Sequence, residues 1–205
     1  SLYGRNNLSG ILERVTRDVF IPITAGGGLR NVEDVGTVLK AGADKAAINT
    51  AALLRPQLIS EVARAFGSQC MVLSIQAKRR DPLNPAAGWE AYYDNGREHS
   101  GRDVLEWVRE AQQLGAGEIL LTGVDREGVR RGLDQELIEA VCSEVTIPVI
   151  AAGGASNSGD LMQAARLGAG AVAMGSLLHY KQATIPQLKK ELTENGVEVR
   201  PCIQQ

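Results

Sequence analysis

An internal repeat constrains the fold of this chain more than any other feature. When the 205-residue sequence is shifted by 126 positions, which is the separation of Asn31 from Asn157, residues 20–50 fall on residues 146–176 without a gap. The identical pairs include Gly27-Gly28 with Gly153-Gly154, Asp34 with Asp160, and Gly42-Ala43 with Gly168-Ala169. Two equivalent units half a protein apart predict a fold that is built from two similar halves.

Short apolar runs alternate along the chain with amphipathic stretches. Leu58, Ile59 and Val62 share one helical face, as do Val104 and Val108. The six candidate strands are short and end in small or polar residues, as buried parallel strands do; they are residues 20–24, 45–49, 71–75, 118–122, 149–152 and 171–174. This alternation predicts a parallel sheet with right-handed crossovers. Together with the repeat, it predicts a TIM (β/α)8 barrel with two-fold internal repetition.

The repeat also predicts how much of such a barrel is present. Under the same offset, residues 71–126 would map to positions before Ser1. We therefore expect residues 1–205 to form a single barrel domain that is N-terminally incomplete and lacks about the first two strands. An open six-stranded sheet would leave two unpaired edges.

Composition and charge disfavour several function classes. The chain has 22 Lys and Arg against 24 Asp and Glu, and neither sign forms a long run, so we expect no nucleic-acid or membrane partner. The three cysteines, Cys70, Cys142 and Cys202, are far apart, which is typical of reduced thiols in the cytoplasm. With only two histidines besides, no metal-ligand spacing exists, and we expect no metal or cofactor.

Two glycine-rich strand ends predict phosphate sites. Gly26–Gly28 and Gly153-Gly154 each follow a candidate strand, and an asparagine that can cap a helix comes three residues later. Glycine lets backbone N–H groups approach a ligand, and the helix N-terminus favours a phosphate. Each motif is followed by a second strand that ends in Asn49-Thr50 or Gly175-Ser176. Tight turns without a ligand are the alternative; two sites on opposite sides of the mouth would suit a bisphosphorylated small molecule.

Other polar residues follow strands at the same end of the predicted barrel. Asp125 and Glu127, in the segment after Thr122, are candidate carboxylates for proton transfer or for binding a hydroxyl, unless this is only a solvated loop. Gln76 would point into the mouth, where it can form hydrogen bonds but cannot exchange a proton near neutral pH. The Asn95-Gly96 pair that follows predicts a small hairpin.

Charged residues also stand where two strands begin, at the opposite end of the barrel. They are Asp44-Lys45 and Glu118. That end of a barrel is normally closed by apolar packing, so the residues alone favour a salt bridge that plugs the base.

In combination, the motifs resemble the cyclase subunit of imidazole glycerol phosphate synthase, an enzyme of histidine biosynthesis. The similarity extends along the whole chain; it is carried by residues 25–28, 41–45, 48–52, 66–69, 115–122, 125–126 and 152–154. The family is a TIM barrel with two-fold internal repetition. The resemblance implies a lyase that forms a heterodimer with a glutaminase subunit docked at the barrel bottom. Ammonia would pass through the barrel to the bisphosphorylated intermediate PRFAR, yielding imidazole glycerol phosphate and AICAR.

The resemblance also implies roles for individual residues. Lys45 and Glu118 would form the gate of the ammonia channel, and Asp44 would face the glutaminase. Asp125 and the position of Gln76 would be catalytic. The residues that would bind phosphate or substrate are Gly28, Asn49, Thr50, Thr122, Gly128, Gly153, Gly154, Gly175 and Ser176.

The sequence departs from the family pattern at two catalytic positions. The family's first catalytic aspartate ends the first strand, which precedes this chain, and the second stands where this chain has Gln76. Loss of a general acid or base lowers a rate by about 10²- to 10⁴-fold. Asp125 or the upstream aspartate would then carry more of the proton transfer. The alternatives are a paralogue that channels ammonia to a sugar amidotransferase of surface-polysaccharide biosynthesis, and a regulatory barrel without a glutaminase partner.

Overall fold

Helices and strands alternate through the computed structural model, which describes residues 8–202. In chain order the elements are α1 (Leu8–Val15), β1 (Thr24–Gly26), α2 (Val32–Lys40), β2 (Lys45–Ile48), α3 (Thr50–Leu54), α4 (Gln57–Phe66), η1 (Ser68–Cys70), β3 (Met71–Arg79), η2 (Pro85–Ala87), β4 (Trp89–Tyr93), β5 (Glu98–Asp103), α5 (Val104–Leu114), β6 (Glu118–Gly123), α6 (Gln135–Glu144), β7 (Val149–Ala152), α7 (Ser158–Arg166), β8 (Ala171–Val172), α8 (Ser176–His179) and α9 (Ile185–Glu194).

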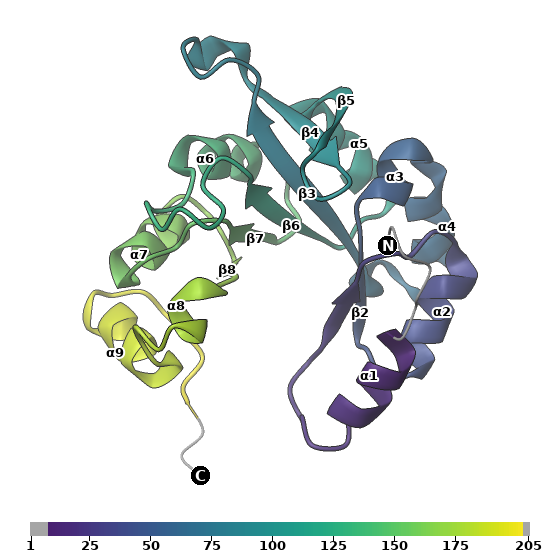
Figure 1. The fold of residues 1–205 in the computed structure, drawn as a ribbon, viewed down its shortest axis with the longest axis horizontal. Coiled ribbons are helices and arrows are strands. Elements are labelled where there is room, and N and C mark those ends of the chain that lie inside the picture. The colour runs from purple at the N-terminus through teal and green to yellow at the C-terminus, as the bar shows by residue number, and fades with distance from the viewer. Residues whose placement is uncertain (1–7, 203–205) are drawn as a thin grey trace.

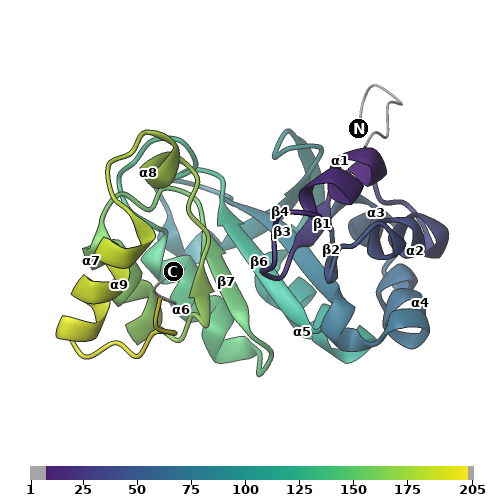
Figure 2. The same cartoon turned by 90° about the horizontal axis from the view of Figure 1, so that it is seen from below.

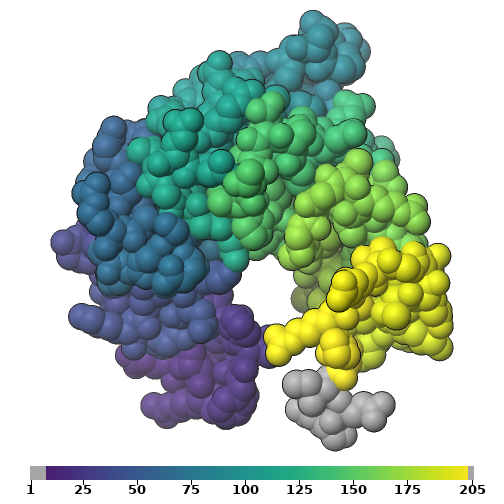
Figure 3. Space-filling view, turned by 180° about the vertical axis from the view of Figure 1, so that it is seen from behind, coloured from purple at the N-terminus to yellow at the C-terminus, as the bar shows by residue number. Residues whose placement is uncertain are grey.

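Six strands form one continuous parallel sheet in the order β1-β2-β3-β6-β7-β8. The sheet curls, and the helices pack on its outer side (Figures 1 and 2). Within the described residues β1 and β8 are its two edges, and the N-terminal and C-terminal parts face each other across an open hollow (Figure 3). This architecture confirms the predicted barrel class.

The strands alternate between a buried outer face and a more accessible inner face. Ile48, Leu73, Ile75, Ile119 and Leu121 are almost completely buried and belong to the main hydrophobic core, which also includes residues of α4 and α5. The residues between them are only partly buried and point into the hollow; along β2, β3 and β6 they include Lys45, Ala47, Ser74, Gln76, Lys78, Glu118, Leu120 and Thr122. The sequence therefore places polar side chains along the inside of the curled sheet.

The two halves of the repeat adopt the same local structure. α2 and α7 are both nine residues long, and they occupy equivalent positions under the offset. Asn31 and Asn157 cap them by accepting hydrogen bonds from the backbone N–H of Asp34 and Asp160. The glycines at the ends of the equivalent strands also share positive φ angles; these are Gly27, Gly28, Gly153 and Gly154. The structure thus confirms the internal repeat and both predicted caps.

One predicted strand was misplaced. β1 begins at Thr24 rather than Phe20, and the side chains of Phe20 and Ile21 are exposed. Pro22 has no N–H with which to continue a strand ladder, and the N–H of Ile23 bonds to the Asp44 carboxylate at 2.7 Å. The apolar run therefore forms the loop that leads into the strand. β8 is also shorter than predicted and ends at Val172.

The predicted hairpin is present as β4 and β5. β4 pairs with the second half of β3, which extends that strand to Arg79. The turn is longer than a two-residue Asn-Gly turn, because Tyr93 pairs with Glu98. Within this turn Asp94, Asn95 and Gly96 all have positive φ angles.

In residues 8–202 no helix combines the length and the apolar character needed to cross a membrane.

Candidate functional site

Three polar residues lie near the carboxyl ends of β2, β3 and β6. Gln76 lies opposite Thr122 in the parallel register of β3 and β6. Asn49 follows β2, and its Nδ2 donates to Gln76 Oε1 at 3.0 Å. The carboxyl ends of parallel strands form the functional face of barrel enzymes. The structure therefore brings these three predicted residues to that face.

The β4–β5 hairpin contacts two of these residues, Gln76 and Asn49. The N–H of Gly96 donates to Gln76 Oε1 at 2.9 Å, and Asn49 Nδ2 also donates to the carbonyl oxygen of Tyr92 at 3.1 Å. The N–H of Asp94 approaches Thr50 Oγ1 at 3.4 Å. The hairpin is thus joined to the strand ends through Gln76, Asn49 and Thr50, which the sequence predicted as site residues.

A cavity opens between the ends of β7 and β8. Its volume is about 290 Å³, and four predicted phosphate or substrate residues line it together with Glu127; they are Gly153, Gly154, Gly175 and Ser176. Gly154 has a φ of 94°, and a Cβ there would lie 2.6 Å from the carbonyl oxygen of Gly132. Glycine is therefore required for the close packing of backbone at this wall.

The corresponding residues of the other half lie at the ends of β1 and β2. These strands pair in parallel from Thr24 with Lys45 to Gly26 with Ala47. Gly28 and Asn49 therefore follow the same edge of the sheet, each a short step beyond its strand. Gly28 has a φ of 76° and Thr50 is exposed.

The segment after β6 carries the two candidate carboxylates, and they have different neighbours. Asp125 is exposed, and its Oδ2 accepts the backbone N–H of Arg79 at 3.0 Å. Glu127 contributes to the wall of the cavity, whereas Gly128, in the same loop, is not among the lining residues. Asp125 is therefore bonded to the end of β3, and Glu127 is the candidate carboxylate that lines the cavity beside Gly153 and Gly154.

The charged residues at the other end of the sheet form the expected salt bridge. Lys45 Nζ pairs with a carboxylate oxygen of Glu118, and the two side chains are 29% and 20% exposed. They begin β2 and β6, so the pair spans β3 on the inner face of the sheet. Asp44 is exposed, and its carboxylate accepts the Ile23 N–H.

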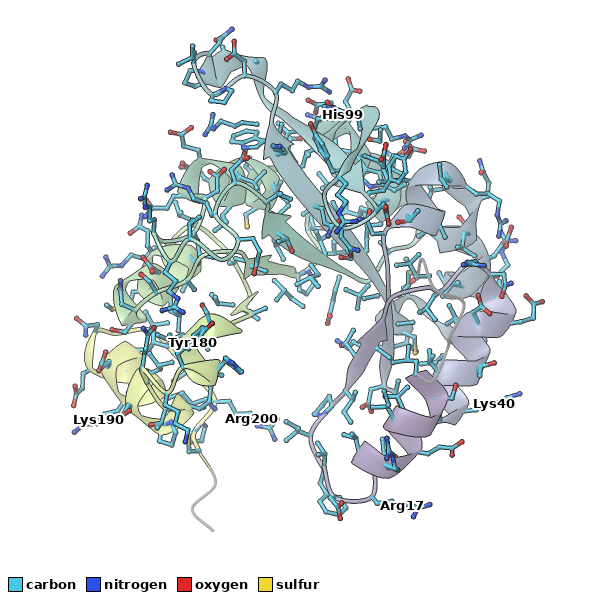
Figure 4. All side chains as sticks on the ribbon, viewed as in Figure 1. Arg17, Lys40, His99, Tyr180, Lys190 and Arg200 are labelled. Atoms are coloured by element: carbon cyan, nitrogen blue, oxygen red, sulfur yellow. The ribbon has the colours of Figure 1, made fainter. Side chains whose placement is uncertain are left out.

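A cluster on the hairpin was not found from the sequence. His99 Nδ1 lies 3.3 Å from Glu90 Oε2, and His99 Nε2 lies 3.1 Å from the Tyr92 hydroxyl. The carboxylate of Glu90 also accepts the Gly101 N–H at 2.7 Å and lies near Arg80. Figure 4 labels His99 on this hairpin. The strand alternation that puts Glu90 and Tyr92 on one face was the only available signal.

This environment changes the ionisation of two groups in the cluster. Burial by itself raises the pKa of Glu90, but the hydrogen bond from Gly101 and the proximity of His99 and Arg80 outweigh it, so the pKa lies below its ordinary value. Burial raises the pKa of Tyr92, and the carboxylates of Glu90 and Asp125 raise it further. The carboxylate form of Glu90 and the protonated phenol of Tyr92 are therefore the favoured forms.

Within residues 8–202 no three His, Cys, Asp or Glu side chains are grouped so that they could hold a metal ion. The three cysteines in this part of the chain are free, and burial raises the pKa of the Cys142 thiol.

Comparisons with known proteins all point to one family of biosynthetic proteins. A family model described as "Histidine biosynthesis protein" matches residues 1–184. An "Imidazole glycerol phosphate synthase subunit HisF" from Legionella pneumophila is 59% identical over 154 residues, which are 75% of this chain and 71% of that protein. The chain therefore belongs to the HisF family of histidine biosynthesis proteins. Proteins with the same name from Mycobacteroides abscessus and Streptococcus sanguinis are 44% and 45% identical over 96% of this chain and 77% of their own length.

Proposed function

We propose that this chain is the cyclase subunit of an imidazole glycerol phosphate synthase. It uses ammonia released by a glutaminase to convert PRFAR into imidazole glycerol phosphate and AICAR. The observation that carries the proposal is the glycine-lined cavity at the ends of β7 and β8 in a chain of the HisF family.

One phosphate of the substrate binds in this cavity. Glycine leaves the backbone N–H groups near Gly154 and Gly175 open to a ligand, and Ser176 adds a hydroxyl. The loop continues into α7, whose N-terminus carries a partial positive charge. The second phosphate binds near Gly28 and Thr50, at the equivalent ends of β1 and β2, and the repeat of the two halves supports this assignment.

The proton transfers of the reaction are carried out by carboxylates and not by Gln76. An amide cannot accept or release a proton near neutral pH. Asp125, which follows the end of β6, is the candidate among the described residues. It would act beside Thr122, which belongs to the partly buried inner row of that strand.

The glutaminase partner docks at the opposite end of the sheet. Lys45 and Glu118 form an ion pair on the inner face there, which supports a role as the gate through which ammonia enters. The exposed carboxylate of Asp44 lies next to this gate and faces the partner.

The continuous sheet supports a single domain over residues 1–205. Three free thiols support a location in the cytoplasm.

A paralogue that delivers ammonia to a sugar amidotransferase is the alternative function that Gln76 suggested. The relatives do not favour it, because all three are named as subunits of the synthase.

The proposal is tested by following ammonia-dependent consumption of PRFAR by the full-length protein, with a Gln76→Asp variant beside it. Turnover by the native protein is expected, and a faster variant would show how much the missing carboxylate costs. No turnover by either protein, with glutaminase activity still stimulated, would overturn the cyclase assignment and favour ammonia delivery to another acceptor.

A further inference from the structure

The neighbours of Gln76 allow its side-chain amide only one orientation. The backbone N–H of Gly96 is always a donor, and it lies 2.9 Å from Gln76 Oε1. If the amide were reversed, its NH₂ group would face that N–H and neither could accept. The oxygen of Gln76 therefore faces the hairpin tip, and its nitrogen faces away.

Asn49 is fixed by the same argument. Its Nδ2 donates to the carbonyl oxygen of Tyr92 at 3.1 Å, an atom that can only accept, and to Gln76 Oε1 at 3.0 Å. Both hydrogens of the amide are thus used to hold β4 and Gln76. Asn49 Oδ1 is buried and has no partner within the described residues. Asn49 and Gly96 together occupy the oxygen of Gln76, so this oxygen is not free for a ligand.

The nitrogen of Gln76 remains available. Gln76 belongs to the partly buried inner row of β3, and its Nε2 has no hydrogen-bond partner in residues 8–202 and is not one of the buried unpaired polar atoms there. It is therefore accessible to solvent, on the row of β3 side chains that alternates with the buried core residues. Lys78 follows two residues later on the same face, and its Nζ lies 5.5 Å from the centre of the Tyr92 ring. Both side chains can supply hydrogen-bond donors at this place.

The hairpin is anchored independently at its base. Trp89 Nε1 donates to Asp134 Oδ2 at 3.2 Å, and the Arg79 guanidinium lies 4.7 Å from the Trp89 ring centre. Further along, Glu90, His99 and Tyr92 join the two strands. The tip is held by other contacts, which include the Gly96 hydrogen bond to Gln76, the longer Asp94 contact with Thr50 and the Val124 side chain beside Gly96.

The tip also has a conformation that needs support. Asp94 and Asn95 have φ angles of 47° and 60°, in a region that residues with a side chain seldom adopt. Such conformations persist where the surrounding structure holds them. Gln76 supplies the shortest hydrogen bond between this turn and the strand ends.

We propose that Gln76 is both a positioning residue for the hairpin and a ligand-binding residue. Its oxygen fixes the tip of the β4–β5 hairpin beside the mouth of the barrel, and its NH₂ group offers the ligand a hydrogen-bond donor. The ligand group that it recognises is an acceptor oxygen, such as the carbonyl of a phosphorylated ketose. The second half of this proposal rests on the proposed function, which places the ligand in the mouth; the first half does not.

The hairpin role is tested by hydrogen exchange of the Gly96 amide in the full-length protein without ligand. Gln76→Glu keeps an oxygen for Gly96 and Asn49, whereas Gln76→Met has a similar length and no acceptor. We expect the Gly96 amide to stay protected in the Glu variant and to exchange at least about tenfold faster in the Met variant. Unchanged protection of β6 amides in both variants would show that the fold is intact. Equal Gly96 protection in the native and Met proteins would overturn this role.

The donor role is tested by binding of ribulose 5-phosphate, with inorganic phosphate as the ligand that lacks the carbonyl. Gln76→Met removes the donor without adding a charge. We expect it to weaken ribulose 5-phosphate binding by about tenfold, the usual size for one hydrogen bond, and to leave inorganic phosphate nearly unchanged. Equal losses for both ligands, or none, would overturn the donor role. If the native protein bound neither ligand, the donor role and the proposed function would both fail, while the Gly96 measurement would still decide the hairpin role.

Discussion

Two glycines in the wall of the β7–β8 cavity serve different purposes. A Cβ at Gly154 would lie 2.6 and 2.7 Å from the carbonyl oxygens of Gly132 and Arg126, and the φ angle there is positive. A Cβ at Gly175 would meet nothing within 4 Å, and its φ is −104°. Gly154 is therefore required by the fold, whereas Gly175 is required only if something must occupy the space beside it.

This difference separates ligand binding from stability. Gly175→Ala should change the free energy of unfolding by less than about 0.5 kcal/mol, as surface substitutions usually do, yet weaken phosphate binding several-fold by filling the cavity. Gly154→Ala should lower the stability by about 1–3 kcal/mol, because of the clash and the positive φ. Urea denaturation and calorimetric titration with inorganic phosphate would measure both. Gly170→Ala is a matched control, since its Cβ would meet Pro148 at an ordinary 3.7 Å outside the cavity. Full phosphate affinity in Gly175→Ala would contradict the site.

The buried carboxylate of Glu90 should make stability depend on pH. Its pKa lies below the ordinary value of 4.5, so its stabilising effect is fully present above that value and is lost as the pH falls through the lower folded-state pKa. Glu90→Gln should cost about 1.5–3 kcal/mol at pH 7, as expected for hydrogen bonds to a charged group. The cost should shrink as the pH is lowered below 4.5. Urea denaturation at several pH values tests this, with exposed Glu98→Gln as the control; a cost that does not vary with pH would contradict it.

The roles of residues whose contacts lie close in sequence were predictable. The roles of residues whose contacts depend on the register between β4 and β5 were not. The positive-φ glycines and the caps Asn31 and Asn157 depend on neighbours within a few positions, which the sequence displays directly. The contact of Glu90 with His99 depends on how β4 pairs with β5, where the register shifts between Glu90 and Tyr92. A bulge of this kind leaves no residue pattern that fixes which side chains meet.

At the scale of elements, α2 and α7 offer a direct comparison of equivalent caps. Asn31 Oδ1 accepts the Asp34 N–H at 2.8 Å, and Asn157 Oδ1 accepts the Asp160 N–H at 3.1 Å. In α7 the Asp160 carboxylate also accepts a hydrogen bond from the N–H of Asn157, which completes a capping box. The repeated sequence thus produces the same helix start twice.

Replacement of either cap by alanine should therefore cost a similar amount. Asn31→Ala and Asn157→Ala should each lower the free energy of unfolding by about 1 kcal/mol, because each leaves a backbone N–H without its acceptor. Chemical denaturation would measure the loss. Asn31→Asp and Asn157→Asp keep the acceptor and should remain near native stability. A cost at only one of the two helices would contradict the equivalence of the halves.

The strands themselves show where sequence patterns stop being informative. The buried alternation of β3 and β6 fits the predicted runs, because apolar residues there face the helices. Phe20 and Ile21 are as apolar as those strand residues, yet they lie exposed in a loop. Apolar character alone does not distinguish a strand from a segment interrupted by Pro22, whose missing N–H delays the start of β1.

At the scale of the whole molecule, the curled sheet separates two groups of polar residues along one inner surface. Gln76, Asn49 and Thr122 lie at the carboxyl ends of the strands, and Lys45 and Glu118 lie where the strands begin. The repeat and the strand order made this separation predictable, since strand direction decides which end each residue occupies. That the hairpin lies at the carboxyl ends was predictable, because it follows the strand that carries Gln76. Which strand ends its tip contacts was not, because nothing in its own sequence specifies them.

The separation leads to a prediction about the assembled enzyme. Under the proposed function, ammonia made by the glutaminase enters past the Lys45–Glu118 pair, whereas added ammonia and the phosphorylated substrate reach the carboxyl ends from solvent. Lys45→Met removes one charge of the pair and leaves Glu118 partly buried and unpaired. It should therefore lower glutamine-dependent turnover several-fold more than ammonia-dependent turnover. Gly175→Ala, at the other end, should lower both to the same extent. Steady-state assays of the full-length protein with its glutaminase, driven by glutamine or by ammonium, would measure the two ratios. If Lys45→Met lowered both activities equally, the ion pair would hold the strands together without controlling a passage.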